Sequence, residues 1–284
     1  AIKNHGLGKE LQDKLYAVIK KFFSLPDDVK AKYEKPEIGF QRGYTGKGKE
    51  HAKGRNTGDL KEFYHVGQEL DSIPDSDETK KEYPDNIWPS EVSEFKEIAN
   101  EAYRTLEAAG KNMLKAIALY LDLEENYFED KVAFGNSILR QIHYFPIENP
   151  DEVPADAVRA AEHGDINLIT LLMGASADGL QVLRKDGKWI PITALPDQLV
   201  VNVGDMLERL TNKKLKSTIH RVVNPPREMM HTSRYSIPFF MHPRSEMDLT
   251  CLDSCVDVDH PKQFEDATAG EFLEERLREL GLKK

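Results

Sequence analysis

Two histidines and one aspartate are spaced along the chain as ligands of a single metal ion would be. His163 and Asp165 are separated by one glycine in EHGDINLITLLMG, just before an apolar run with the composition of a strand. In an extended backbone residues i and i+2 point to the same side, so both side chains can face one point. His220, in LKSTIHRVVNP, lies on another strand-like run that folding could bring alongside the first. We predict that His163, Asp165 and His220 bind one metal ion.

This donor set indicates which metal the site holds. Two imidazoles and one carboxylate on one face of an octahedral ion leave three positions open, which suits a non-haem Fe(II) that binds a co-substrate and dioxygen together. The set contains no thiolate, which disfavours a structural zinc site. The sequence therefore predicts an oxygen-activating iron centre. A metal-binding jelly-roll without turnover is a remote alternative, because a pure binding module has no need for open metal positions.

A second pair of polar residues indicates the co-substrate. Arg234 and Ser236, in TSRYSIPFF, are again i and i+2 on a predicted strand and face the same way. A guanidinium group can bind a carboxylate through two parallel hydrogen bonds, so this pair is a candidate carboxylate clamp. 2-Oxoglutarate requires such a clamp, since its keto acid end chelates the metal while its distal carboxylate is held by a buried arginine. We predict 2-oxoglutarate as co-substrate and dioxygen as oxidant.

Short apolar runs surround these residues and predict the fold. Between residues 137 and 241, runs of this kind alternate with Gly, Pro, Asp and Asn turns, which is typical of a sandwich or barrel. Apolar residues recur at helical spacing over residues 8–26, 88–121 and 268–284. The predicted fold is mainly β with flanking helices. It has a double-stranded β-helix (jelly-roll) core, a helical N-terminal region and a C-terminal helix.

We expect a single oxygenase domain over the whole chain. Its predicted parts are a mostly helical N-terminal region, a jelly-roll core with the metal site, and a C-terminal turn and helix, at residues 1–135, 136–245 and 246–284. The Gly- and Lys-rich stretch 36–58 lacks periodicity and predicts a long loop, which could be a lid. Arg42 and Tyr44 of this loop lie beside a glycine and are candidate substrate-binding residues. His143 is a further candidate that is equally compatible with a structural role, because it should face away from Tyr144 on a regular strand.

Composition limits the classes of partner. A net charge of −10 and a pI near 5.5 argue against a nucleic-acid binder, which needs a basic face. No stretch is long and apolar enough to span a bilayer. Two cysteines are too few for a disulfide framework, and the opening residues show no targeting pattern, so we expect a cytoplasmic protein. We expect a monomer that acts on a small molecule.

Nearly the whole chain resembles the isopenicillin N synthase-like branch of the Fe(II)/2-oxoglutarate-dependent oxygenases. The resemblance lies in the opening IKNHG, in DGLQVL and VVNVGDMLERLTN of the core, and in KSTIHRVVNP and RYSIPFF near the end. It implies that His163, Asp165 and His220 bind the iron and that Arg234 and Ser236 bind the co-substrate, in agreement with the predictions above. It also implies a role for Tyr144, in IHYFP, which matches a tyrosine that often binds the co-substrate carboxylate. Many plant members have an asparagine where this chain has Ile142.

The resemblance also implies the reaction. Such enzymes couple the decarboxylation of 2-oxoglutarate to succinate and CO2 with hydroxylation, desaturation or cyclisation of a small molecule. Some relatives, such as isopenicillin N synthase and aminocyclopropane-carboxylate oxidase, keep the metal triad and an Arg-x-Ser pair without using 2-oxoglutarate. A non-haem iron oxidase of that type is therefore the alternative function.

Overall fold

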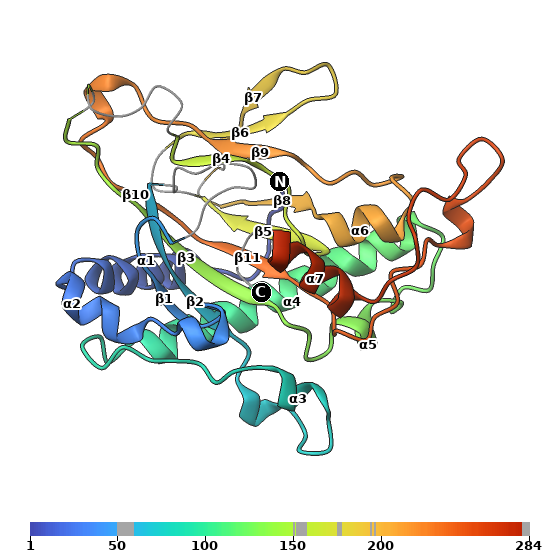
Figure 1. The fold of residues 1–284 in the computed structure, drawn as a ribbon, viewed down its shortest axis with the longest axis horizontal. Coiled ribbons are helices and arrows are strands. Elements are labelled where there is room, and N and C mark those ends of the chain that lie inside the picture. The colour runs from blue at the N-terminus through green and yellow to red at the C-terminus, as the bar shows by residue number, and fades with distance from the viewer. Residues whose placement is uncertain are drawn as a thin grey trace.

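The computed structural model describes residues 1–49, 60–149, 151, 158–174, 178–193, 195 and 197–279 (Figure 1). The α-helices in these ranges are α1 (Lys9–Phe23), α2 (Asp27–Lys30), α3 (Thr79–Glu82), α4 (Phe95–Tyr120), α5 (Glu129–Val132), α6 (Asp205–Leu210) and α7 (Ala269–Glu279). The strands are β1 (Gly43–Thr45), β2 (Lys61–Gly67), β3 (Ile138–Tyr144), β4 (Ala160–His163), β5 (Ile169–Met173), β6 (Leu180–Leu183), β7 (Trp189–Pro191), β8 (Leu199–Val203), β9 (His220–Val222), β10 (Arg234–Ser236) and β11 (Pro238–Met241).

Two antiparallel sheets form the core of the molecule. The larger sheet has the order β1-β2-β3-β11-β5-β8, and β10 pairs with β3 beside β11. The smaller sheet has the order β4-β9-β6-β7. Side chains from both sheets line a common cavity between them, as expected where two sheets are stacked face to face. The predicted jelly-roll with flanking helices is confirmed.

Helices cover the outer face of the larger sheet (Figure 1). The long helix α4 packs on β2, β5 and β11, and α1 packs on α4. Gly110 allows this close approach, because a Cβ atom there would lie 2.4 Å from the Met241 sulfur on β11. Leu106 of α4 and Leu171 and Phe239 of the sheet are fully buried in the resulting apolar core. The packing of α4 on its outer face therefore holds the larger sheet in place, and this fixes the side chains on its cavity face.

Most strands have a β-like sequence pattern and were predicted, whereas those without such a pattern were not. The predicted apolar runs contain β3, β5 to β9 and β11. β1 and β2 were not predicted. Every residue of β2 is buried, and its sequence KEFYHVG begins with charged residues and does not alternate between apolar and polar residues. The predicted run 233–241 forms two strands, β10 and β11, that are separated by Ile237. Part of the predicted loop 36–58 forms β1, and its residues 50–58 lie outside the described ranges.

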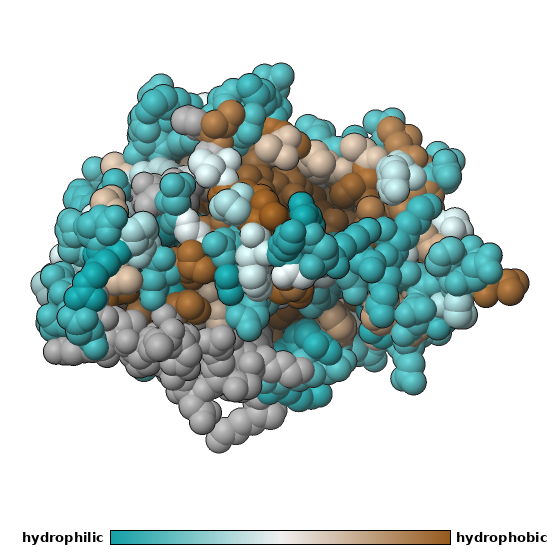
Figure 2. Space-filling view, turned by 90° about the horizontal axis from the view of Figure 1, so that it is seen from above, coloured by the Kyte–Doolittle hydropathy of each residue, from teal (hydrophilic) through white to brown (hydrophobic). Residues whose placement is uncertain are grey.

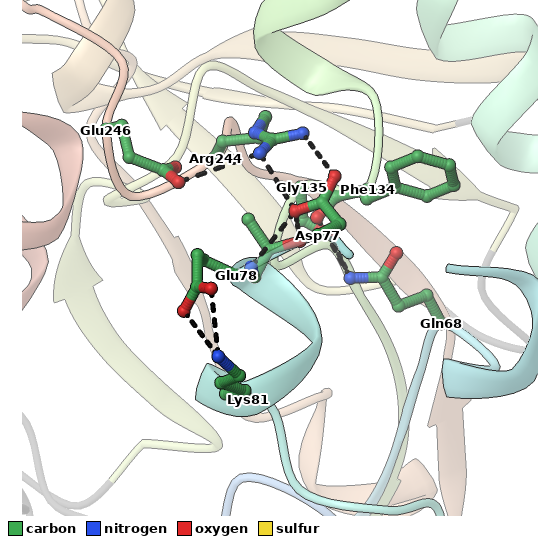
Figure 3. A network of polar contacts seen from close by, with 9 residues as sticks. Gln68, Asp77, Glu78, Lys81, Phe134, Gly135, Arg244 and Glu246 are labelled. Atoms are coloured by element: carbon green, nitrogen blue, oxygen red, sulfur yellow. Dashed lines mark hydrogen bonds and ion pairs between the residues drawn. The ribbon is translucent and has the colours of Figure 1, made fainter. Parts of the chain in front are cut away.

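A polar network joins the segment around α3 to the chain after β11 (Figure 3). The Arg244 guanidinium donates two hydrogen bonds to the Asp77 carboxylate, each 3.0 Å long. The Arg244 backbone N–H donates to the Lys131 carbonyl, and the Gln68 amide donates to the carbonyls of Phe134 and Gly135. The hydrogen bonds from Thr79 and Arg244 lower the pKa of Asp77. These contacts fix the entry to β3 and the exit from β11.

Figure 2 shows one face of the molecule. Seen from the side on which β6 and β7 lie in Figure 1, hydrophilic residues form the rim and apolar residues gather near the centre (Figure 2). Within the described ranges, no helix has the length and apolarity to cross a membrane.

His242 makes the stability of the fold dependent on pH. Its side chain is buried directly after β11, and this burial lowers its pKa to about 4. In the unfolded chain a histidine has a pKa of about 6.5, so the unfolded state binds a proton that the folded state excludes. Stability is therefore expected to fall as the pH falls from about 6.5 to about 4, by about 3 kcal/mol in total.

Urea unfolding of the metal-free protein at several pH values measures this effect. The difference in unfolding free energy between the wild type and His242→Gln isolates it, because the carboxylates titrate in both proteins. We expect the two curves to converge as the pH falls. Parallel curves would contradict a neutral buried His242.

Candidate metal and co-substrate site

The structure brings His163, Asp165 and His220 together at one side of the cavity. One ligand atom from each lies within 4.8 Å of the others, and the His220 Nε2 to Asp165 Oδ1 distance is 3.8 Å. His163 is the last residue of β4, and His220 opens the neighbouring strand β9, directly opposite it in register. Asp165 lies in the connection from β4 to β5, just before the strand that the apolar run predicted. Among the described residues, this is the one group of three such ligands.

Hydrogen bonds orient all three side chains. The Nδ1 atoms of His163 and His220 bond the carbonyls of Ala161 and Thr218, at 2.7 and 2.9 Å. A carbonyl only accepts, so each Nδ1 carries the proton and each Nε2 offers a lone pair. Asp165 Oδ2 accepts hydrogen bonds from Thr170 Oγ1 and Asn202 Nδ2, at 2.6 and 2.8 Å. Its Oδ1 instead faces His220, so Oδ1 is the oxygen positioned to bind a metal.

The charge of Asp165 also suits a metal ligand. Its side chain is buried, and burial alone would raise its pKa. The positive charge that His220 and His163 carry when protonated, together with the hydrogen bonds from Thr170 and Asn202, outweighs burial and holds the pKa of Asp165 below its usual value. The group is thus an anion at neutral pH. Two neutral imidazole nitrogens and one carboxylate oxygen, with no sulfur donor, fit a ferrous ion.

The co-substrate candidates lie on another wall of the same cavity. Arg234 and Ser236 of β10 are both buried and both line it, together with Tyr144 of β3. Arg234 lies opposite Tyr144 in register, with its guanidinium 4.9 Å from the centre of the tyrosine ring. Lys61 of β2 lies on the other side of Tyr144 in register and also lines the cavity. The predicted clamp and the predicted metal ligands thus line one cavity.

Arg42, Tyr44 and His143 do not belong to the described lining of this cavity. Tyr44 and His143 lie on the helix-covered face of the larger sheet, where both bond the buried Glu62 carboxylate. Arg42 is fully buried, donates to the Gln41 carbonyl and packs against Gly67. We therefore do not assign these residues to the substrate. His143 faces away from Tyr144 as alternation predicts, whereas the sequence did not indicate which face Arg42 and Tyr44 occupy.

Four other residues of the site were not predicted from the sequence. Lys61 and Arg140 line the cavity, and Thr170 and Asn202 bond Asp165. Arg140 could have been found by alternation, since it shares a face with Ile142 and Tyr144 on β3. Lys61 could not have been found in this way, because β2 was not recognised. The partners of Asp165 require knowledge of which strands pair.

A jelly-roll with a two-histidine, one-carboxylate group inside it defines a class of protein, the mononuclear non-haem metal enzymes. Comparison with known proteins identifies the family. Residues 135–243 match the 2OG-Fe(II) oxygenase superfamily, and residues 1–91 match the family described as non-haem dioxygenase in morphine synthesis N-terminal. The chain belongs to the 2OG-Fe(II) oxygenase superfamily.

Individual relatives agree with this assignment. A 2-oxoglutarate-Fe(II) type oxidoreductase of Emericella nidulans is 31% identical over 293 residues, which cover 100% of this chain and 82% of the relative. A 2OG-Fe(II) oxygenase family protein of Caulobacter crescentus has a solved structure with 44% identity and a TM-score of 0.87, covering 98% of this chain and 88% of that one. A full-length Neurospora crassa protein, solved with α-ketoglutarate and thymine, has 30% identity and a TM-score of 0.83, covering 97% and 85%.

The predicted enzyme class is confirmed. The protein is a 2-oxoglutarate-dependent dioxygenase, and its family uses Fe(II), 2-oxoglutarate and dioxygen.

Proposed function

We propose that His163, Asp165 and His220 hold the ferrous ion, and that Arg234, Ser236 and Tyr144 hold the distal carboxylate of 2-oxoglutarate. The observation that carries this assignment is that both groups line one cavity, on facing sheets. His163 and His220 offer Nε2, and Asp165 offers Oδ1, because their other polar atoms already have hydrogen-bond partners. Bound iron with 2-oxoglutarate supplies the activation of dioxygen for oxidation of the substrate.

The residues around the ion position and shield the reaction. Arg234 neutralises one carboxylate of the co-substrate and sets its direction, since a guanidinium binds a carboxylate in a fixed geometry. Thr170 and Asn202 keep Asp165 in one orientation, as outer-shell partners of metal ligands do. Apolar side chains such as Leu172, Val200 and Val222 line the rest of the space and exclude water.

The proposal also includes a small-molecule substrate and membership of the isopenicillin N synthase-like branch, which the motifs around His220 and Arg234 support. The Neurospora crassa relative, with 30% identity, has been solved with thymine and with 5-formyluracil. Small heterocycles are therefore the first compounds to test. The alternative function, an oxidase that does not use 2-oxoglutarate, is disfavoured, because the Emericella nidulans relative is a 2-oxoglutarate-Fe(II) type oxidoreductase and the Neurospora crassa relative was solved with α-ketoglutarate.

Oxygen uptake with and without 2-oxoglutarate tests the proposal. We expect the iron-loaded enzyme to consume dioxygen and release succinate only when 2-oxoglutarate is present, because the clamp and the open metal positions together bind it. Slow turnover of 2-oxoglutarate without a substrate is sufficient for this measurement. Uptake that proceeds equally well without 2-oxoglutarate would contradict the proposed clamp.

A further inference from the structure

A row of side chains on the helix-covered face of the larger sheet lies directly behind the proposed 2-oxoglutarate clamp. Glu62 of β2 is opposite His143 of β3 in register, and His143 is opposite Tyr235 of β10. Tyr235 stands between Arg234 and Ser236, the two clamp residues of β10. Neighbouring residues of a strand point to opposite faces, so the row faces the helices while the clamp faces the cavity. The function proposed above gives this row no role.

Glu62 is the centre of a buried polar network. Its carboxylate is fully buried and accepts hydrogen bonds from three side chains, namely His143 Nδ1 at 2.7 Å, Lys30 Nζ at 2.7 Å and the Tyr44 hydroxyl. Burial alone would raise the pKa of Glu62, but these hydrogen bonds outweigh it and lower the pKa. Glu62 is therefore an anion that helix α2 and strands β1 and β3 hold in one position.

His143 connects this carboxylate to β10. Because the Glu62 carboxylate only accepts, His143 Nδ1 carries a proton. The other ring nitrogen, Nε2, bonds the hydroxyl of Ser233, the residue just before β10, at 3.0 Å. The His143 ring also stacks on the Tyr235 ring, with 4.8 Å between the ring centres and 15° between the planes. Both contacts reach the segment of backbone that carries the clamp.

β10 is a short strand whose position depends on such contacts. It is three residues long, and in the described part of the chain β3 is the strand that pairs with it. A short strand paired on one side has few backbone hydrogen bonds, so cross-strand side-chain pairs contribute much of what fixes its position. A binding group needs to be held within about 0.5 Å of its productive geometry by its neighbours. The network behind β10 provides this support for the clamp.

Stability alone does not account for a polar network at this place. A buried ion pair is often no more stabilising than apolar residues of similar volume, whereas its hydrogen bonds have a defined direction. Elsewhere the helix-covered face of the larger sheet is mostly apolar, with fully buried side chains such as Tyr64, Val66, Leu139 and Phe239. The charged network thus lies where the clamp on the opposite face requires a defined orientation.

We infer that Glu62 and His143 are positioning residues for the co-substrate, which hold β10 so that Arg234 and Ser236 present the geometry that 2-oxoglutarate binds. The inference rests on the proposed function, since it takes Arg234 as the group that binds the distal carboxylate. Loss of the network should weaken the binding of 2-oxoglutarate but not that of iron, because both histidine ligands lie on the smaller sheet.

Titration of 2-oxoglutarate into the anaerobic Fe(II) protein, followed by visible charge-transfer absorption, tests this inference. We expect Glu62→Gln to raise the Kd for 2-oxoglutarate about tenfold, the effect of a lost hydrogen bond to a charged group. The Kd for Fe(II) should stay within about twofold, a change too small to be a lost hydrogen bond. Ser233→Ala removes only the link to β10 and should raise the Kd for 2-oxoglutarate about threefold, as a neutral hydrogen bond implies. It is the second variant in case Glu62→Gln folds poorly.

Tyr64→Phe is the matched control. Tyr64 is buried on the same face of β2 as Glu62, and its hydroxyl donates to the Ile87 carbonyl at 2.7 Å. The control therefore removes a buried hydrogen bond from the same strand without touching the link to β10. We expect it to leave the Kd for 2-oxoglutarate within about twofold of the wild type.

Two further measurements separate positioning from a general loss of stability. In an Arg234→Gln background, Glu62→Gln should change the Kd by less than about twofold, because residues that act through one group have non-additive effects. Hydrogen exchange of the metal-free protein should show faster exchange of the amides of residues 234–236 in Glu62→Gln than in Tyr64→Phe.

Three results would overturn the positioning role: equal Kd values in Glu62→Gln and Tyr64→Phe, an undiminished effect of Glu62→Gln in the Arg234→Gln background, or equal exchange of the β10 amides in the two variants. Failure of the proposed function has a different signature. An Arg234→Gln variant that binds 2-oxoglutarate as tightly as the wild type would contradict the clamp itself, and the positioning role would fall with it.

Discussion

Asp165→Ala is expected to abolish succinate release, with a loss on the order of a thousandfold or more, because it removes the one anionic ligand of the proposed iron site. Equilibrium dialysis with Fe(II) should show weaker metal binding by the same variant. The two histidines alone offer only neutral donors, and these do not offset the charge of a divalent ion. The measurement is succinate formed per enzyme at saturating 2-oxoglutarate.

Asp197→Ala provides the control for this change. Asp197 is an exposed carboxylate that pairs with Lys3 on the surface, so its loss should leave turnover unchanged. Asp165→Asn is a second variant that preserves the shape of the side chain, in case the alanine variant folds poorly. Undiminished succinate release in a folded Asp165 variant would remove the assignment of this residue as a ligand.

Arg234→Gln is expected to raise the half-saturating concentration of 2-oxoglutarate about a hundredfold, as the loss of a charge-assisted bidentate pair in a buried site implies. Turnover should recover at high 2-oxoglutarate, because the variant retains the metal ligands. Succinate release as a function of 2-oxoglutarate concentration measures both quantities.

Arg244→Gln is the matched control, since Arg244 also binds a carboxylate with two hydrogen bonds but does so outside the described cavity lining, in the network with Asp77. It should lower stability without changing the response to 2-oxoglutarate. An unchanged half-saturating concentration in Arg234→Gln would contradict the proposed clamp.

The sequence predicted those parts of the fold in which local pattern and tertiary structure agree. Strands such as β5 and β8 are rich in branched apolar residues and end at turn residues, so their pattern was sufficient. β2 and β4 were missed because their sequences, KEFYHVG and AAEH, have no alternating pattern. These strands form because neighbouring strands pair with them, which a local pattern does not report.

The residues of the candidate site also differ in whether the sequence pattern could reveal them. His163, Asp165, Arg234 and Ser236 were predicted because i and i+2 spacing places residues on one face wherever the backbone is extended. Tyr44 was misplaced because it faces the helices from β1, a strand that the sequence did not reveal. Thr170 and Asn202 were missed because their importance depends on the pairing of β5 with β8.

The division of the site between two sheets has a mechanical consequence. His163 and His220 belong to the smaller sheet, whereas Arg234 and Ser236 belong to the larger one. A 2-oxoglutarate molecule bound to the metal at one end and to Arg234 at the other would bridge the smaller and the larger sheet. A ligand that binds only the folded state stabilises it by mass action. The free energy that holds the two sheets together should therefore increase with the occupancy of the site by iron and 2-oxoglutarate.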